Sequence, residues 1–150
     1  MREILSRGKR LADGEWIEGF YVRIYDSKGN VSHRIYPGYA ESDCGEFYPE
    51  WFEVDPDTIG QYIGRCDKNG KNIFEGDILR RYSDYCEAYF SEGVVNYGKF
   101  NCGCCDGVYG WYLEGGDIRN LDVDAAHMDI EICGNIHDNP ELLEVADATN

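Results

Sequence analysis

Short runs of apolar and aromatic residues alternate along the chain with clusters of turn-forming residues. In residues 16–25, the apolar side chains of Phe20, Val22 and Ile24 stand at every second position. Successive side chains of a β-strand point to opposite faces, so this spacing predicts a strand. Similar runs predict further strands in the second half of the chain, at residues 93–100, 107–114 and 128–136.

Three clusters of turn residues separate the runs in the first half. They are residues 12–15 (ADGE), 26–30 (DSKGN) and 67–71 (DKNGK). Each lies between segments that carry β-branched and aromatic residues, which is typical of a β-hairpin. The dipeptide Asn69-Gly70 predicts a type I′ turn, in which both central residues have positive φ.

Residues 58–79 (TIGQYIGRCDKNGKNIFEGDIL) are the most patterned stretch of the chain and raise the question of a chemical site. The Asn-Gly turn and the strand residues beside it account for the pattern without any chemistry. We therefore interpret the stretch as a hairpin, in which Gly60, Gly64 and Gly76 mark bends or close approaches of the backbone. The side chains that suggested a site are Arg65, Cys66, Asp67, Lys68 and Asp77.

Residues 37–50 contain two Pro, two Gly and several acids, so they are predicted to be a loop. Such a loop suggests a single domain with two β sub-units, about 1–40 and 45–150, that share a core. Near the end of the chain, Asn139 can cap a short helix and Pro140 can take its first position. Further short helices are expected around residues 55–58 and 122–127.

These elements predict a mainly β protein. We expect antiparallel hairpins or a meander that lead into a small SH3-like or barrel-like unit, followed by the short C-terminal helix. The high aromatic content, with twelve Tyr, six Phe and three Trp, favours the same class because aromatic residues suit pleated, half-buried surfaces.

The net charge narrows the range of partners. Asp and Glu outnumber Lys and Arg by 29 to 14, which gives a formal net charge of −15. A nucleic-acid binder needs a basic face that displaces counterions from phosphates, so the charge argues against DNA or RNA binding. Three roles of the acidity stay open: attraction of a basic protein, imitation of DNA to inhibit a host DNA-binding protein, and solubility alone.

Aromatic residues crowd around the acidic segment and give the first candidate site. Tyr and Trp are common interface anchors, because they bury a large area with few rotatable bonds. In the alternative interpretation, Trp51 and Phe52 fill the core between the sub-units. The candidate partner-binding residues are Tyr39, Phe47, Tyr48 and Trp51.

The second candidate site is a cysteine cluster. Cys102 and Cys105 have the two-residue gap of a zinc knuckle, and Cys104 lies between them. No second pair follows, so a zinc ion would need isolated ligands, and a thiol-rich hairpin loop is the alternative. The isolated residues that could complete such a site are Cys86, Cys133, His127 and His137.

No other pattern predicts an enzyme or a cofactor. A nucleophile needs its base within hydrogen-bond reach, and the spacing of Cys133 and His137 alone does not place them so. No phosphate-binding glycine loop is present. The seven cysteines, the lack of a secretion signal and the lack of a long apolar run lead us to expect a cytoplasmic protein with reduced thiols, off the membrane.

Seven segments carry a shared pattern in order along the chain: residues 2–4, 7–9, 14–16, 53–64, 67–71, 73–78 and 134–143. Together they resemble the YopX family of bacteriophage and prophage proteins. The sequence departs from the family pattern at Ser6 and at Arg65-Cys66, and the resemblance is weakest over residues 82–126. It implies a small, largely β protein carried by phages of bacteria, and it supplies no catalytic residues. We therefore expect a non-enzymatic accessory protein that acts in the bacterial host cell by contact with a host or phage protein.

Overall fold

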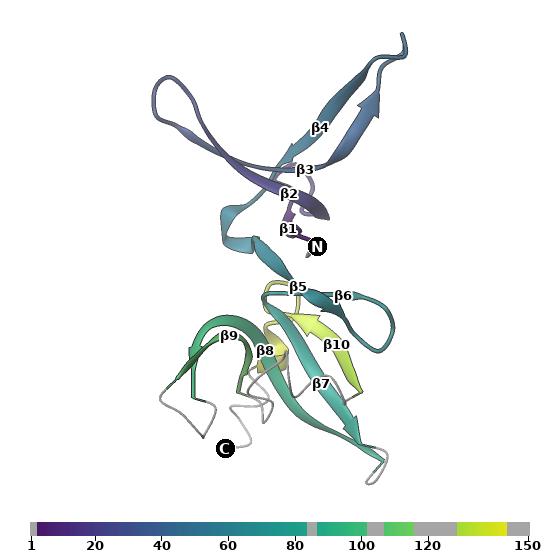
Figure 1. Ribbon diagram of the computed structural model, residues 1–150, viewed down its shortest axis with the longest axis vertical. Helices are drawn as coiled ribbons and strands as arrows, with labels where there is room; N and C mark the ends of the chain where they lie inside the picture. The colour runs from purple at the N-terminus through teal and green to yellow at the C-terminus, as the bar shows by residue number, and fades with distance from the viewer. Residues whose placement is uncertain (1–2, 84–86, 102–106, 116–128, 144–150) are drawn as a thin grey trace. The chain divides into compact units, whose positions relative to one another are not determined.

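The computed structural model describes residues 3–83, 87–101, 107–115 and 129–143. The chain divides into two compact units, Met1–Tyr62 and Ile63–Asn150. Both are built from antiparallel strands, so the predicted mainly β class is confirmed (Figure 1). The boundary falls at Tyr62 and Ile63, not near residues 40–45 where the sequence placed it.

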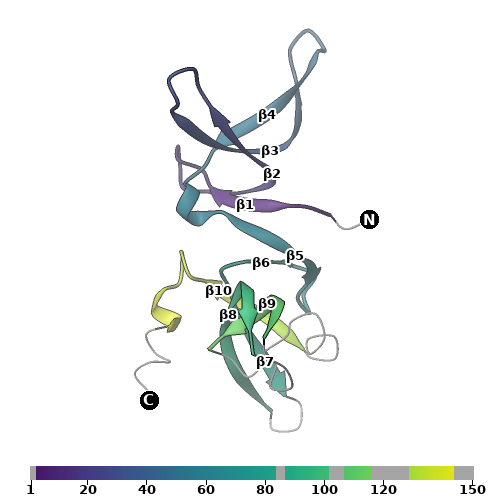
Figure 2. The same ribbon diagram turned by 60° about the vertical axis from the view of Figure 1, so that its left-hand side comes forward.

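The first unit is a sheet of hairpins in the order β4-β3-β2-β1-β5. Each strand pairs antiparallel with its neighbour, and β4 is the outer strand (Figure 2). The strand predicted for residues 16–25 is confirmed, since this segment is β2. The strands are β1 (Ser6–Lys9), β2 (Trp16–Tyr25), β3 (Val31–Glu41), β4 (Phe47–Glu53) and β5 (Gly60–Cys66).

The second unit begins within β5, which forms a hairpin with the short strand β6 and leads to a four-stranded antiparallel sheet in the order β10-β7-β8-β9. Over the described residues the sheet is open, so the predicted barrel-like unit is wrong in this respect. The bounds are β6 (Asn72–Phe74), β7 (Asp77–Ser83), β8 (Ala88–Phe100), β9 (Val108–Glu114) and β10 (Ile130–Asn135).

The loop predicted for residues 37–50 is instead a hairpin. Strand β3 runs to Glu41, and β4 starts at Phe47, so only residues 42–46 turn. The two prolines of this segment are the reason that the sequence predicted a loop. Pro37 lies at a bulge, where the pairing shifts between Ile35 and Gly38, and Pro49 lies on the outer strand. Both are places where a strand tolerates a residue without an N–H group.

Three hairpins share one turn chemistry. Asp26, Ser42 and Asp67 each stand first in a five-residue turn, and the oxygen of each side chain accepts a hydrogen bond from the backbone N–H four residues later. A Gly with positive φ follows as the fourth residue of each turn. In the turn at Asp67, only Gly70 has positive φ, so the predicted type I′ geometry is wrong. The acceptor side chain favours instead a three-residue loop with one left-handed glycine.

Two of the three expected short helices fall where the sequence placed them. Pro56–Thr58 form a 3₁₀-helix capped by Asp55, whose side chain accepts from the N–H of Asp57. Residues 141–143 form the helical turn at the C-terminal end. The side-chain oxygen of Asn139 reaches back to the N–H of Asn135, an added role for the predicted cap. The helix expected at residues 122–127 lies outside the described residues.

The two units differ in how many of their apolar side chains are buried. Within the second unit, residues from strands β5 to β10 form a contiguous apolar core. In the first unit, Ile35 and Val54 are fully buried, and they pack where Gly8 lets the strands approach closely. Much of β2 is exposed on both faces. The core of the second unit consists of Ile63, Ile73, Leu79, Val95, Trp111, Leu113 and Ile130.

Gly19 allows the backbone of β3 to pass close to β2. A Cβ atom at this position would overlap the carbonyl group of Tyr36 and lie 2.8 Å from the Cα of Pro37. We expect Gly19→Ala to lower the free energy of unfolding by about 1–3 kcal/mol, because backbone atoms must move to accept the methyl group. Urea denaturation measures the loss.

Gly38→Ala is the matched control, since a Cβ atom there meets nothing within 4 Å. Its effect should stay within about 0.5 kcal/mol, as for an ordinary surface change. Equal losses in the two variants would show that the close approach of β2 and β3 does not constrain the fold.

Candidate functional site

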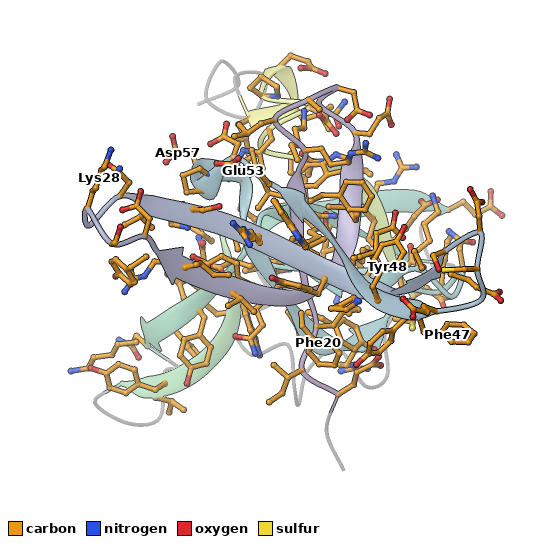
Figure 3. All side chains as sticks on the ribbon, turned by 90° about the horizontal axis from the view of Figure 1, so that it is seen from above. Phe20, Lys28, Phe47, Tyr48, Glu53 and Asp57 are labelled. Carbon is orange, nitrogen blue, oxygen red and sulfur yellow. The ribbon has the colours of Figure 1, made fainter. Side chains whose placement is uncertain are left out.

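The candidate aromatic residues lie on one projecting hairpin. We call residues 38–51 the aromatic arm: the second part of β3, the turn and most of β4. The turn at Ser42 lies at one end of the sheet, and the β2–β3 turn that carries Lys28 lies at the other (Figure 3). Two features stabilise the turn at the end of the arm. Gly45 has a φ of +81°, and the Ser42 hydroxyl group accepts a hydrogen bond from the N–H of Glu46.

All four predicted partner-binding residues are exposed. Tyr39 exposes 75% of its surface, Phe47 72%, Tyr48 50% and Trp51 43%. The guanidinium group of Arg34 lies over the Trp51 ring, 3.7 Å from its centroid. Trp51 is therefore not a core residue. Its neighbour Phe52 is half-buried beneath Arg10.

The strand register divides the four residues between two faces. Directly opposed residues on antiparallel strands share a face, and neighbours along a strand alternate. Tyr39 opposes Pro49, and Phe47, Pro49 and Trp51 follow at every second position of β4. Tyr48 points the other way. The structure thus brings Tyr39, Phe47 and Trp51 together and separates Tyr48 from them.

Sequence reasoning missed two residues of the same face. Arg34 opposes both Glu53 on β4 and Val22 on β2, so Val22 shares the face of Trp51. Phe20 stands two residues earlier and exposes 66% of its surface. Alternation had placed Phe20 and Val22 on one side of a strand, but alternation alone does not say whether that side is covered.

Charge is segregated along the first unit. From residue 35 to residue 64 the sequence contains seven acids and no Lys, Arg or His. The basic residues of this unit precede residue 35, including Arg7 and Lys9, which lie over the Trp16 ring. The aromatic arm is therefore acidic along its whole length. The seven acids are Glu41, Asp43, Glu46, Glu50, Glu53, Asp55 and Asp57.

The central stretch, residues 58–79, is organised by buried carboxylates with structural roles. Oδ1 of Asp67 accepts from the N–H groups of Asn69 and Lys71, at 2.9 Å each, inside the turn. Oδ2 accepts from the N–H of Ile132 on β10 at 3.1 Å. Burial acts to raise the pKa of Asp67, but these backbone bonds outweigh it and hold the pKa below its ordinary value. The carboxylate stays charged and ties the turn to β10.

Asp77 is the second buried carboxylate of this stretch. Only 1% of its surface is exposed, and its Oδ2 accepts from the N–H of Phe74 at 2.8 Å. Gly76, with φ +88°, donates its N–H to Val95 and accepts from Ile136. The interpretation of this stretch as a hairpin is thus supported, because the carboxylates contact the protein's own backbone.

The predicted zinc loop, with Cys102, Cys104 and Cys105, lies outside the described residues, as do Cys86 and His127. That site stays a prediction. Over the described ranges, no group of three or more His, Cys, Asp or Glu side chains could hold a metal ion. The thiol of Cys133 donates to the carbonyl oxygen of Ile78 at 3.3 Å. No apolar helix of bilayer-crossing length occurs in the part of the chain that the structure describes.

The fold and the arm define a class of protein: two antiparallel β units, one with a compact core and one that presents exposed aromatic side chains. The YopX protein family matches residues 10–144, and the chain belongs to this family. The segments before residue 10 that resembled the family lie outside the matched range.

A solved structure has the same architecture. The crystal structure of protein EF1440 from Enterococcus faecalis is 25% identical in sequence, with a TM-score of 0.51. The similarity covers 95% of this chain and 99% of that one. A search of curated proteins finds no match.

Asp67→Asn tests the role of the buried carboxylate. At neutral pH we expect a loss of about 1–3 kcal/mol in unfolding free energy, because buried N–H groups lose a charged acceptor. Since the folded pKa is lowered, this stabilisation is complete above the ordinary pKa of an aspartate and fades as pH falls through the folded value. Urea denaturation from pH 7 to pH 3 should show the two proteins converging.

Asp26→Asn is the control, because Asp26 heads the same kind of turn on an exposed surface and bonds to Lys28 and Asn30 within that turn. It should cost less than Asp67→Asn. Two results would show that the hydrogen bond from β10 to Asp67 does not cause the stabilisation. One is an equal loss of unfolding free energy in both variants; the other is a difference between wild type and Asp67→Asn that does not narrow in acid.

Proposed function

We propose that this chain is a non-enzymatic accessory protein of a bacteriophage or prophage. It acts in the cytoplasm of the bacterial host by binding a host or phage protein through the acidic aromatic arm. The observation that supports this most is the exposure of Tyr39, Phe47 and Trp51 together on one hairpin. Contiguous apolar surface on a soluble protein commonly marks an interaction site.

A second candidate has a specific observation in its favour. Seven acids without a base over residues 35–64 resemble, in charge alone, one flank of a nucleic acid. The chain would then inhibit a host DNA-binding protein by occupying its DNA site. Duplex DNA added to a captured complex discriminates, because it should displace such a partner and leave any other partner bound.

Affinity capture tests the proposed function. Immobilised wild-type chain should retain a specific protein from lysate of the host bacterium at about 50 mM salt, where attraction between charges is strongly felt. A variant with Tyr39, Phe47, Tyr48 and Trp51 all replaced by Ser should lose it, since large aromatic anchors carry most of the binding energy at interfaces.

Tyr109→Ser, which removes an exposed aromatic side chain from β9 of the second unit, serves as control and should retain the partner. The proposal is refuted if the wild type retains nothing at low salt. It is equally refuted if the fourfold variant, shown to be folded by circular dichroism, captures the same protein as the wild type.

A further inference from the structure

One face of the first sheet carries exposed apolar side chains from three neighbouring strands. The register places Tyr39, Phe47 and Trp51 on this face together with Phe20 and Val22. Each of the five is exposed by more than a third of its surface. Because strands β4, β3 and β2 are neighbours in the sheet, these side chains cross the sheet and do not lie along a single hairpin. We call these five residues the apolar strip.

Two acids stand on the same face at the margins of the apolar strip. Glu41 opposes Phe47 near the turn, and Glu53 opposes Arg34 near the other end of β4. No basic residue follows Arg34 until after residue 64. Arg34 is a cation on the same face, and its guanidinium group already lies over the Trp51 ring. An extended ligand that crosses the apolar strip therefore meets aromatic rings at its centre, Glu41 beyond Phe47, and Glu53 next to Arg34.

We infer that the apolar strip is the docking surface, and that its occupant is an extended, basic segment of another protein in which Lys or Arg alternates with apolar residues. The inference rests on the proposed function and specifies both the face and the chemistry of the partner. Apolar side chains of such a segment pack on the rings, and its cations reach Glu41 and Glu53 or lie over the rings. The Arg34 guanidinium over Trp51 shows the same contact within the chain.

The outer edge of the sheet is a poorer place for such a segment. Strand β4 is the outer strand, and a partner strand could pair with its free backbone groups. Pro49 lies in the middle of β4 and has no N–H to donate. Glu50 on the same strand further protects this edge, as charged residues do on the edge strands of many sheets. The face, which holds the side chains, is the better site.

The charges also argue against other occupants. A second copy would bring two acidic arms together, and like charges juxtaposed across an interface cost free energy. An anionic lipid surface attracts basic segments and would repel this one. Nucleic acid is disfavoured by the same carboxylates. A basic protein segment with apolar side chains is the occupant whose binding both the aromatic rings and the acids of this face would favour.

Peptides of defined sequence test the inference directly. The probe is a fluorescent peptide of about eight residues, an ordinary strand length, that alternates Arg with Val. Fluorescence anisotropy at low salt should show saturable binding to the wild type. A Glu-Val peptide of the same length should not bind, and oligolysine should bind more weakly because it lacks apolar side chains.

Two double variants locate the binding face. Tyr39→Ser/Phe47→Ser should weaken binding of the Arg-Val peptide by about tenfold or more, the loss expected from removal of interface anchors. Tyr25→Ser/Val31→Ser removes two exposed apolar side chains from the opposite face and should change the affinity less than about twofold, as a surface change away from the site does. Circular dichroism confirms that both are folded.

Several outcomes would overturn the inference: no binding of the Arg-Val peptide, equal losses in both double variants, or equal binding of the Glu-Val peptide. It would also be overturned by self-association of the wild type in light scattering that is lost in Tyr39→Ser/Phe47→Ser, or by binding to phosphatidylserine vesicles. If the lysate partner is retained by both double variants alike, the proposed function stands and the choice of this face fails.

Discussion

The buried carboxylate of Asp67 carries the contact on which the second unit depends. One oxygen closes the turn between β5 and β6, and the other accepts from the backbone of Ile132 on β10. A second link joins the same turn to the same strand, because the N–H of Lys68 donates to the carbonyl of Ile130. A buried charge is tolerated only when hydrogen bonds replace water, so this carboxylate fixes which strands must come together.

That constraint explains why the central hairpin is a structural element. Ile63 on β5 and Ile73 on β6 belong to the same core as Ile130 on β10. The turn at Asp67 therefore brings the first hairpin of the unit onto a strand more than sixty residues later in the sequence. The carboxylate of Asp67, one of the groups that first suggested chemistry at this stretch, accepts hydrogen bonds from three backbone N–H groups.

The first unit uses the same turn chemistry for a different result. Its turns at Asp26 and Ser42 hold hairpins whose side chains are largely exposed. Few residues besides Ile35 and Val54 are fully buried there. A sheet with so little cover presents its aromatic side chains to whatever binds it, and this contrast with the second unit is why we place function on the arm.

Local sequence determined the positions of the turns at residues 12–15, 26–30 and 67–71, the strand at residues 16–25 and the short helix near Pro56, because each depends on residues within a few positions of one another. It also determined the candidate residues of the arm, although it took their segment for a loop. A proline argues against a strand, except on an outer strand or at a bulge. Pro49 lies on the outer strand and Pro37 at a bulge, and only the pairing of the strands in the sheet reveals these positions.

The sequence by itself determined that the chain is β-rich, acidic and built largely from hairpins. Only the tertiary structure decided that Asp67 reaches β10, that Trp51 stays exposed, and that Tyr48 faces away from Tyr39. The physical reason is the same in each case. Strand pairing between distant segments sets which side chains share a face and which backbone groups a carboxylate can reach, and no local pattern encodes that pairing.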